Sequence, residues 1–290
     1  MDRRIRCWAA AVALAGLAGC ISLPQPKRIS VPQTARTETE HILYAPTTWQ
    51  GEIRLIRPVI VTKTATLTLQ PGTRVFFDMP PVEEGKDPEP WIRVLGSLVA
   101  LGTPEAPIVL TSVGLRNNEF EDMIALEGAK EAHFRHVTFE RGPWAVHSHE
   151  TPVDFEDCVF RANYGGARFQ GGRVVIRRCR FEDNRIGVRC LNGSPVIEES
   201  VFVGNVTGIF FRQGVKAAVL RRNNFDNREY DLKLGEGQAD DVDAAQNWWK
   251  AAAEGKLAER IFDGADSEGV GRVTVEPQLT VPWGTPEKKK

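Results

Sequence analysis

Apolar residues in the second half of the chain recur at a fixed interval. Five phenylalanines stand 21, 21, 21 and 23 residues apart, at Phe139, Phe160, Phe181, Phe202 and Phe225. Self-similarity at such a period is typical of a solenoid, in which each repeat buries its apolar face against its neighbours. The pattern therefore predicts a stack of equivalent units.

Around each phenylalanine, apolar and polar residues alternate with a period of two, which is typical of strands and not of helices. Three columns of the repeat are predicted to face inward. They are Phe134, Phe155, Ile176, Ile197 and Leu220; then Val137, Cys158, Cys179, Ser200 and Asn223; and then Val146, Ala167, Val188, Ile209 and Leu232. Each repeat is therefore predicted to form one coil of a parallel β-helix.

Turn residues also recur in register between these strands. Asparagine stands three residues after the phenylalanine at Asn163, Asn184 and Asn205, and glycine six residues after it at Gly166, Gly187 and Gly208. Asparagine tolerates the left-handed region and glycine any positive φ, so the pattern predicts a tight bend at these positions.

Charged residues alternate in sign from one repeat to the next. The column four residues before the phenylalanine reads Arg135, Glu156, Arg177, Glu198 and Arg221. Strands stacked in parallel lie about 4.8 Å apart, so the alternation predicts exposed ion pairs between successive coils.

Short β-rich runs separated by turn residues fill the first half, and they predict roughly three further coils, hence about eight in all. Near the other end, residues 250–262 could form a short helix that caps the last coil, with Trp248 and Trp249 closing the core. The sequence thus predicts an all-β, single-stranded parallel β-helix over residues 42–245 and a C-terminal cap with a basic tail over residues 246–290.

Several segments resemble bacterial surface proteins of the pectate-lyase-like right-handed parallel β-helix type. They are Trp49-Gln-Gly, Leu67-Thr-Leu-Gln-Pro-Gly-Thr-Arg-Val-Phe, Val94-Leu-Gly-Ser-Leu-Val-Ala-Leu-Gly-Thr, Pro107-Ile-Val-Leu-Thr-Ser and Asn247-Trp-Trp. The resemblance covers about residues 49–283 and implies the right-handed fold. It does not specify a function, because this fold hosts lyases, hydrolases, adhesins and inert scaffolds.

The amino terminus has the organisation of an export signal. A basic stretch, Met1-Asp-Arg-Arg-Ile-Arg, precedes an apolar run from Cys7 to Gly16 and then Leu17-Ala-Gly-Cys20. The last four residues resemble the bacterial lipobox, which implies removal of residues 1–19, lipidation of Cys20 and anchoring in a membrane. An ordinary secretory peptide is the alternative.

If the lipobox is used, residues 20–41 hold the lipidated cysteine and a polar, proline-containing tether. The protein is then expected in the bacterial cell envelope. Ile21 after the cysteine favours the outer membrane.

Overall composition points to no particular partner. The chain has 290 residues, 42% of them hydrophobic, and a formal net charge of −1, so we expect no nucleic-acid partner. Cys158 and Cys179 share one inward column, which allows either a disulfide or buried thiols. Buried thiols are favoured because small apolar residues fill the same column elsewhere.

One exposed column is the best candidate for ligand binding. It contains His147, Arg168, Arg189, Phe210 and Lys233. Basic groups at strand spacing with an aromatic ring among them could hold an acidic glycan through charge and ring stacking. The alternative is that these side chains only keep the surface soluble.

Four histidines between residues 133 and 149 suggest a metal site as a weaker possibility. His147 and His149 stand two apart on one predicted strand and should face the same way, as in copper, zinc or nickel sites. His133 and His136 belong to a different side of the coil, so all four should not converge. Fold-level analogy adds copper handling as a weak functional alternative.

No catalytic set emerges from the acidic residues. A lyase on this fold needs acidic Ca²⁺ ligands with a basic proton acceptor, and a hydrolase needs clustered carboxylates. Asp154, Glu156 and Asp157 are close in sequence, but arginines stand on the neighbouring coils. The leading hypothesis is a membrane-anchored, non-catalytic scaffold that binds a glycan, envelope component or protein. The alternative is a polysaccharide lyase or hydrolase, with Ca²⁺ in the lyase case.

Overall fold

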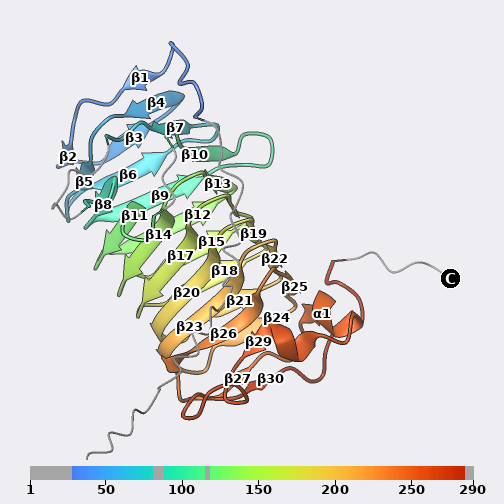
Figure 1. The fold of residues 1–290 in the computed structure, drawn as a ribbon. Helices are drawn as coiled ribbons and strands as arrows, with labels where there is room; N and C mark the ends of the chain where they lie inside the picture. The colour runs from blue at the N-terminus through green and yellow to red at the C-terminus, as the bar shows by residue number, and fades with distance from the viewer. Residues whose placement is uncertain (1–27, 81–87, 115–117, 285–290) are drawn as a thin grey trace, which may run out of the picture.

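The protein forms an elongated stack of parallel strands (Figure 1). The computed structural model describes residues 28–80, 88–114 and 118–284. Three long sheets, named A, B and C here, run along the stack with ten, ten and eight strands. The paired strands in them are parallel.

The chain visits the three sheets in the order B, C, A. Sheet A contains β1 (Arg36–Thr37), β4 (Glu52–Leu55), β7 (Arg74–Phe77), β10 (Ile108–Ser112), β13 (Val137–Glu140), β16 (Val159–Arg161), β19 (Arg180–Glu182), β22 (Val201–Val203), β25 (Asn224–Asp226) and β28 (Trp248–Trp249). Sheet B contains β2 (Ile42–Leu43), β5 (Val59–Val61), β8 (Ile92–Val94), β11 (Asp122–Glu127), β14 (Trp144–His149), β17 (Gly165–Gln170), β20 (Ile186–Gly193), β23 (Thr207–Val215), β26 (Tyr230–Gly237) and β29 (Ile261–Phe262). Sheet C contains β3 (Thr47–Trp49), β6 (Thr66–Leu69), β9 (Ser97–Leu101), β12 (Glu131–Arg135), β15 (Val153–Glu156), β18 (Val174–Arg177), β21 (Val196–Glu198) and β24 (Val219–Arg221).

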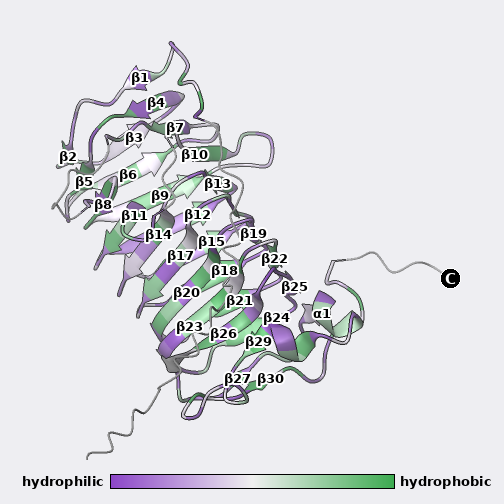
Figure 2. Ribbon diagram, viewed as in Figure 1, coloured by the Kyte–Doolittle hydropathy of each residue, from purple (hydrophilic) through white to green (hydrophobic). Residues whose placement is uncertain are grey.

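Eight consecutive coils, from β2–β4 to β23–β25, therefore carry a strand on all three sides. This confirms the predicted β-helix and its approximate number of coils. Hydrophilic and hydrophobic residues alternate along the strands (Figure 2), because successive side chains of a strand point to opposite faces.

The phenylalanine column forms a continuous ring stack inside the cylinder. The rings of Phe139, Phe160, Phe181 and Phe202 are buried and nearly parallel, with centroids 4.6–4.8 Å apart along the three steps. Trp249 extends the stack beyond Phe225 at 4.4 Å. The prediction that a tryptophan closes the core end is thus confirmed for Trp249, whereas Trp248 lies on the other face of the strand and is only half-buried.

The recurring asparagines do not form the bend that the sequence suggested. Positive φ falls one residue earlier, at Ala162, Asp183 and Gly204. Asn163, Asn184 and Asn205 are buried instead, and each side-chain oxygen accepts a hydrogen bond from the backbone N–H of the preceding coil's turn, as from Asn163 N to Asn184 Oδ1 at 3.0 Å. Their amide nitrogens donate to backbone carbonyls such as Phe160 O at 2.9 Å. The three side chains form an asparagine ladder that satisfies the buried backbone N–H and C=O groups of successive turns.

The recurring glycines also have a different role from the predicted one. Gly166 and Gly187 do not have positive φ. A Cβ added at Gly166 would lie 2.4 Å from Gly187 O and 2.7 Å from the Phe181 ring. Glycine is therefore required at this position by the close approach of the next coil and of the phenylalanine stack.

Charge alternation does produce ion pairs between coils. Arg177 Nε lies 3.2 Å from Glu198 Oε2, and Arg161 Nη2 lies 2.6 Å from Glu140 Oε2. Glu156 is instead paired with Arg178 in the adjoining turn. Of the predicted column, Arg177 and Glu198 are the one ion pair between neighbouring coils in the described structure, so the prediction of ion pairs between coils is confirmed, although most of these pairs use other partners.

Structure begins before residue 42. β1 pairs with β4, and residues 28–32 cross the outer face of sheet A, where Ile29 N donates to Val113 O at 3.3 Å. Residues 28–41, which the sequence assigned to the tether, therefore pack on the body. Residues 1–19 and Cys20, the predicted signal and lipidation site, lie outside the described residues.

The C-terminal cap is shorter than the predicted helix. It consists of α1 (Lys250–Ala253) and a 3-10 turn, η1 (Leu257–Arg260), separated by Gly255 at positive φ. β27 (Val242–Asp243) and β30 (Val273–Thr274) pair beside it as a small separate sheet.

Cys158, Cys179 and Cys190 are buried free thiols, which confirms the favoured alternative. Burial is the main cause that raises the pKa of the Cys179 thiol well above its usual value. Within the described ranges, no helix is both long and apolar enough to span a membrane.

Candidate binding surface on sheet B

The predicted binding column exists as one row across sheet B. His147 on β14, Arg168 on β17, Arg189 on β20, Phe210 on β23 and Lys233 on β26 are consecutive partners in the parallel register. The residues on either side of each face inward, so these five side chains project outward. They are not chemically equivalent, because their neighbours differ.

Arg168 and His147 are bound to one carboxylate. Arg168 Nη2 lies 2.8 and 2.9 Å from the two Asp122 oxygens, and His147 Nδ1 lies 3.0 Å from Asp122 Oδ2. The side chains of Arg168 and Asp122 are only 12% and 10% exposed. The positive charge of Arg168 is therefore balanced within the protein, and the contact fixes the orientation of the His147 imidazole.

Arg189, by contrast, has no carboxylate partner among the described residues. Its guanidinium lies over the Trp144 ring, 4.9 Å from the centroid, and Arg168 lies over the same ring at 5.2 Å. Burial lowers the pKa of Arg189, and the nearby charges of Arg168 and Arg212 lower it further. The cation–π contact partly offsets the cost of placing this charge in a half-buried site.

The Trp144 ring can lie flat on the sheet because of Gly165. A Cβ on Gly165 would lie 2.1 Å from that ring, so only glycine leaves room for it. Trp144 is completely buried. It forms the floor beneath the two arginines.

Lys233 lies among three aromatic rings. Its Nζ is 5.0 Å from the Tyr230 centroid, 5.2 Å from that of Phe262 and 5.9 Å from that of Phe210. No carboxylate pairs with it in the described part of the chain. Arg212 is exposed at a bulge of β23, where the register shifts after Phe211. Arg189, Arg212 and Lys233 are named here the cationic row.

The loop of residues 118–121 contacts the column at Arg168. Glu119 Oε2 accepts a hydrogen bond from Tyr164 Oη at 3.1 Å, and Glu119 O lies 3.3 Å from Arg168 Nη1. Phe120 beside it is 70% exposed. The loop also contacts the edge of β14, where Trp144 N donates to Glu121 O at 3.2 Å.

The histidines do not converge. The rings of His147 and His149 lie 4.3 Å apart, while His133 lies on sheet C near Asp154, with Nδ1 3.2 Å from Oδ2. Burial, followed by the neighbouring His147, lowers the pKa of His149. The described residues contain no group of three or more histidine, cysteine or acidic side chains placed to hold a metal.

The acidic residues near position 156 are engaged in ion pairs. Asp154 pairs with Arg173 at 2.7 Å, and Asp157 pairs with Arg178 at 2.9 Å. Glu156 also contacts Arg178. The arginines of neighbouring coils thus neutralise this cluster, as the sequence suggested.

Several residues of the surface escaped the sequence reasoning. Asp122, Trp144 and Tyr164 lie outside the five-residue column: Asp122 neutralises Arg168, Trp144 lies beneath Arg168 and Arg189, and Tyr164 holds Glu119 of the loop. Asp122 lies on β11, one coil before His147 on β14. Its contact with His147 could be predicted only from the register of this fourth coil, whose spacing departs from the repeat. Gly165, the register partner of Trp144 on β17, is the one sequence signal, because it alone lacks a side chain in the row Trp144, Gly165, Ile186, Thr207 and Tyr230.

Comparison with known proteins supports the fold. Residues 108–247 match the family model described as "Right handed beta helix region". Searches against curated proteins and against solved structures gave no match. Together with the three parallel sheets, the match shows that the chain contains a right-handed parallel β-helix domain.

Proposed function

We propose that the protein is a lipid-anchored envelope scaffold that binds an acidic glycan on the outer face of sheet B. The observation that carries the proposal is the cationic row, because Arg189, Arg212 and Lys233 have no carboxylate partner among the described residues. The other exposed charges on the repeat are largely paired between coils. Unpaired cations on a rigid surface favour a polyanionic ligand.

The aromatic rings add a second kind of contact. Phe210, Tyr230 and Phe262 are half-buried around Lys233, and each exposes part of its ring. Sugar rings bind through stacking on aromatic faces, and carboxylates bind to arginine through paired hydrogen bonds. In a polyuronate each sugar ring carries a carboxylate, so rings and carboxylates recur along the polymer. On sheet B, cations and aromatic rings alternate along the register Arg189, Phe210, Lys233 and Phe262, which offers both kinds of contact.

A glycan-array screen of the full chain tests the proposal. We expect uronate-containing glycans to be retained and their neutral analogues not to be, and Arg189→Ala to lose the signal. Arg135→Ala is the matched control, since Arg135 is an exposed arginine on sheet C that forms no ion pair with any of the described residues. Equal retention of neutral glycans, or an unchanged signal in Arg189→Ala, refutes the glycan proposal.

The lipid anchor is tested separately. Cys20→Ser should leave the precursor unacylated and move the protein from the detergent phase to the aqueous phase. If the wild-type chain is already found in the aqueous phase after expression in a bacterium that acylates lipoproteins, the anchor proposal is wrong. The outcome does not affect the glycan test.

One observation favours an enzymatic alternative. The Asp122–His147 contact at 3.0 Å fixes an imidazole next to Arg168 in the column, as in acid–base catalysis. A polysaccharide lyase would then release unsaturated uronates, and His147→Gln would abolish the product while retaining glycan binding. Absence of product from all retained glycans, with and without Ca²⁺, removes this alternative.

A further inference from the structure

Exposed apolar side chains gather at the N-terminal end of the stack. Ile42, Tyr44 and Ile56 are 39%, 71% and 41% exposed, and they are three of the seven large hydrophobic side chains that are exposed in the described structure. All three lie in the first coil, β2–β4, or directly after it, and β2 is the outermost strand of sheet B (Figure 1). Single exposed apolar residues need no explanation, whereas a group of them marks an interaction site.

The local contacts place these side chains along one edge. Ile42 and Tyr44 stand two apart on β2 and its continuation, with a buried residue between them, so both point outward. Arg57, which follows Ile56, donates from Nη2 to Thr39 O just before β2. The turn that carries Ile56 therefore lies beside the start of the strand that carries Ile42.

The surroundings of this edge carry more positive than negative charge. Residues 39–44 and 56–64 contain Arg57 and Lys63 but only one carboxylate, Glu40. Arg57 and Lys63 are exposed, and neither forms an ion pair within the described ranges. Aliphatic side chains, an amphipathic aromatic ring and cations together are typical of a surface that contacts the interface of an anionic bilayer.

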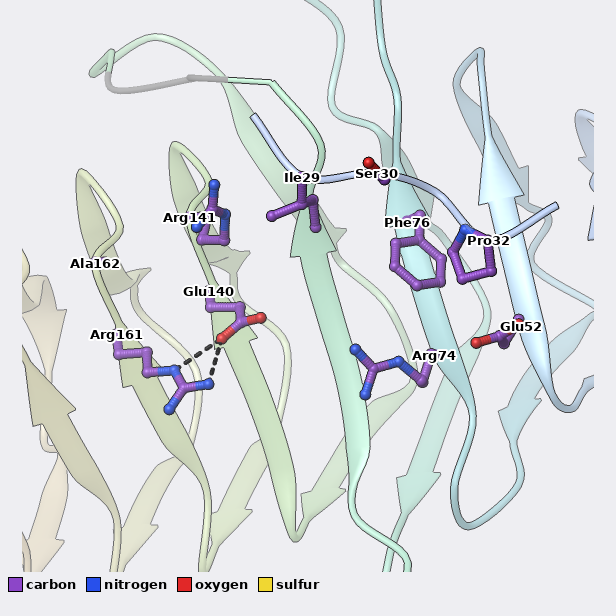
Figure 3. Close-up of a pocket in the computed structure, with 10 residues that line it drawn as sticks. All are labelled: Ile29, Ser30, Pro32, Glu52, Arg74, Phe76, Glu140, Arg141, Arg161 and Ala162. Carbon is purple, nitrogen blue, oxygen red and sulfur yellow. Dashed lines mark hydrogen bonds and ion pairs between the residues drawn. The ribbon is translucent and has the colours of Figure 1, made fainter. Parts of the chain in front are cut away.

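The described part of the chain begins close to the same end. Arg28 Nη2 lies 3.0 Å from Asp78 Oδ1, and Asp78 Oδ2 accepts a hydrogen bond at 3.0 Å from Nε of Arg54, two residues before Ile56. From Arg28 the chain crosses the outer face of sheet A, where Figure 3 shows Ile29, Ser30 and Pro32. Cys20 precedes Arg28 by eight residues, which span at most roughly 29 Å. An acyl chain on Cys20 would therefore bring this end of the stack, and not the C-terminal cap, to the bilayer.

We propose that the N-terminal patch, formed by Ile42, Tyr44, Ile56, Arg57 and Lys63, rests on a bilayer that contains anionic phospholipids. This placement rests on the proposed function for the acyl anchor that brings the patch to the membrane. The two isoleucines enter the interface, the tyrosine lies at the level of the headgroups, and the cations face the lipid phosphates.

Contact at the N-terminal patch determines how the protein stands on the membrane. Arg189 on β20 lies six strands beyond β2 in sheet B, which is roughly 29 Å at the spacing of parallel strands. The stack then stands upright on its first coil. The cationic row is held clear of the headgroups, where a glycan can reach it.

The binding test uses residues 20–290 with Cys20→Ser, which retain every described residue and carry no acyl chain. Partition onto vesicles of phosphatidylcholine, with or without phosphatidylglycerol, is measured by flotation over a range of lipid concentrations. We expect stronger partition with phosphatidylglycerol, and a loss of at least about tenfold in the double variant Ile42→Ser, Tyr44→Ser. Lys63→Ala should lose about fivefold on the phosphatidylglycerol vesicles alone.

The matched control is the double variant Leu101→Ser, Phe120→Ser. These side chains are 40% and 70% exposed, nearly as in the test pair, but they lie outside the first coil. Their replacement should change partition by less than about twofold. No partition of the chain without patch substitutions, or an equal loss in both double variants, overturns the proposal. A dimer that only the patch variant dissociates, with no binding to vesicles, would assign the patch to a second copy of the chain and overturn it as well.

The orientation is tested in the acylated full chain. A fluorophore on Thr64→Cys should be quenched by brominated lipids and one on Val281→Cys should not, since Cys158, Cys179 and Cys190 are buried and do not compete for the label. Equal quenching of the two labels contradicts the upright orientation. Because the partition test lacks the acyl chain and the glycan, failure of either part of the proposed function leaves its result unchanged.

Discussion

The asparagine ladder continues beyond Asn205, whose Nδ2 donates to Asn227 Oδ1 at 2.8 Å, and it ends at the ionisable side chain of Asp231. This ending leads to a prediction about pH. Asp231 Oδ1 accepts hydrogen bonds from Asn227 N at 2.9 Å and from Asn227 Nδ2 at 2.7 Å. The side chain is 1% exposed. Burial, the largest effect, raises the pKa of Asp231 from 3.8 to about 6.

The sign of the effect on stability follows from the two protonation states. Below pH 3.8 the carboxyl is protonated in both the folded and the unfolded chain. Between 3.8 and about 6 the unfolded chain releases the proton and the folded chain retains it, so the free energy of unfolding falls as pH rises. At about 1.4 kcal/mol per pKa unit, the loss approaches roughly 3 kcal/mol above pH 6.

Asp231→Asn keeps an oxygen acceptor for Asn227 and removes the titration. We expect the variant to match the wild type near pH 4 and to be more stable at pH 7, by up to roughly 3 kcal/mol. Urea unfolding of both proteins at pH 4, 5, 6 and 7 measures the difference. The reasoning is refuted if both proteins show the same pH dependence, or if the variant is the less stable one at pH 7.

Three further predictions concern the ladder, the ring stack and the surface histidine. Asn184→Ala removes the acceptor for Asn163 N, and unfolding in urea should show a loss of about 2–4 kcal/mol; a loss below about 0.5 kcal/mol would contradict the ladder. Phe181→Ala should cost about 3–5 kcal/mol in the same assay, whereas a cost typical of a surface site would speak against the stack. His149 should titrate below 6.5 by NMR, and its contribution to stability should be lost as pH falls below 6.5; a midpoint above 6.5 would contradict its burial.

Much of the fold was predictable because its strongest constraint is local and repeated. Phe160, Phe181 and Phe202 stack in the structure at the interval seen in the sequence. The period-two alternation identified the inward columns, since a one-residue error would turn every side chain to the other face. What the repeat could not reveal is why asparagine and glycine recur, because a buried ladder and a tight bend both favour those residues.

The candidate surface was predictable only in part. The register placed Arg168 and Arg189 in one column, but it could not show that Asp122 neutralises the first and that Trp144 lies beneath both. These contacts depend on the irregular coil around residue 122, where the spacing departs from the repeat. The sequence also did not predict that residues 28–32 pack on sheet A. Ile29 carries no periodic signal, and its contact with Val113 joins residues far apart in the chain.

The central claim, that the cationic row on sheet B binds an acidic glycan, is tested most directly by calorimetric titration of an oligouronate into the full chain at two salt concentrations. The account predicts binding that weakens with salt and falls about tenfold with each of Arg189→Ala and Lys233→Ala, while Arg135→Ala leaves it unchanged. Oligouronate binding of equal strength in all four proteins would place the ligand elsewhere and contradict the claim.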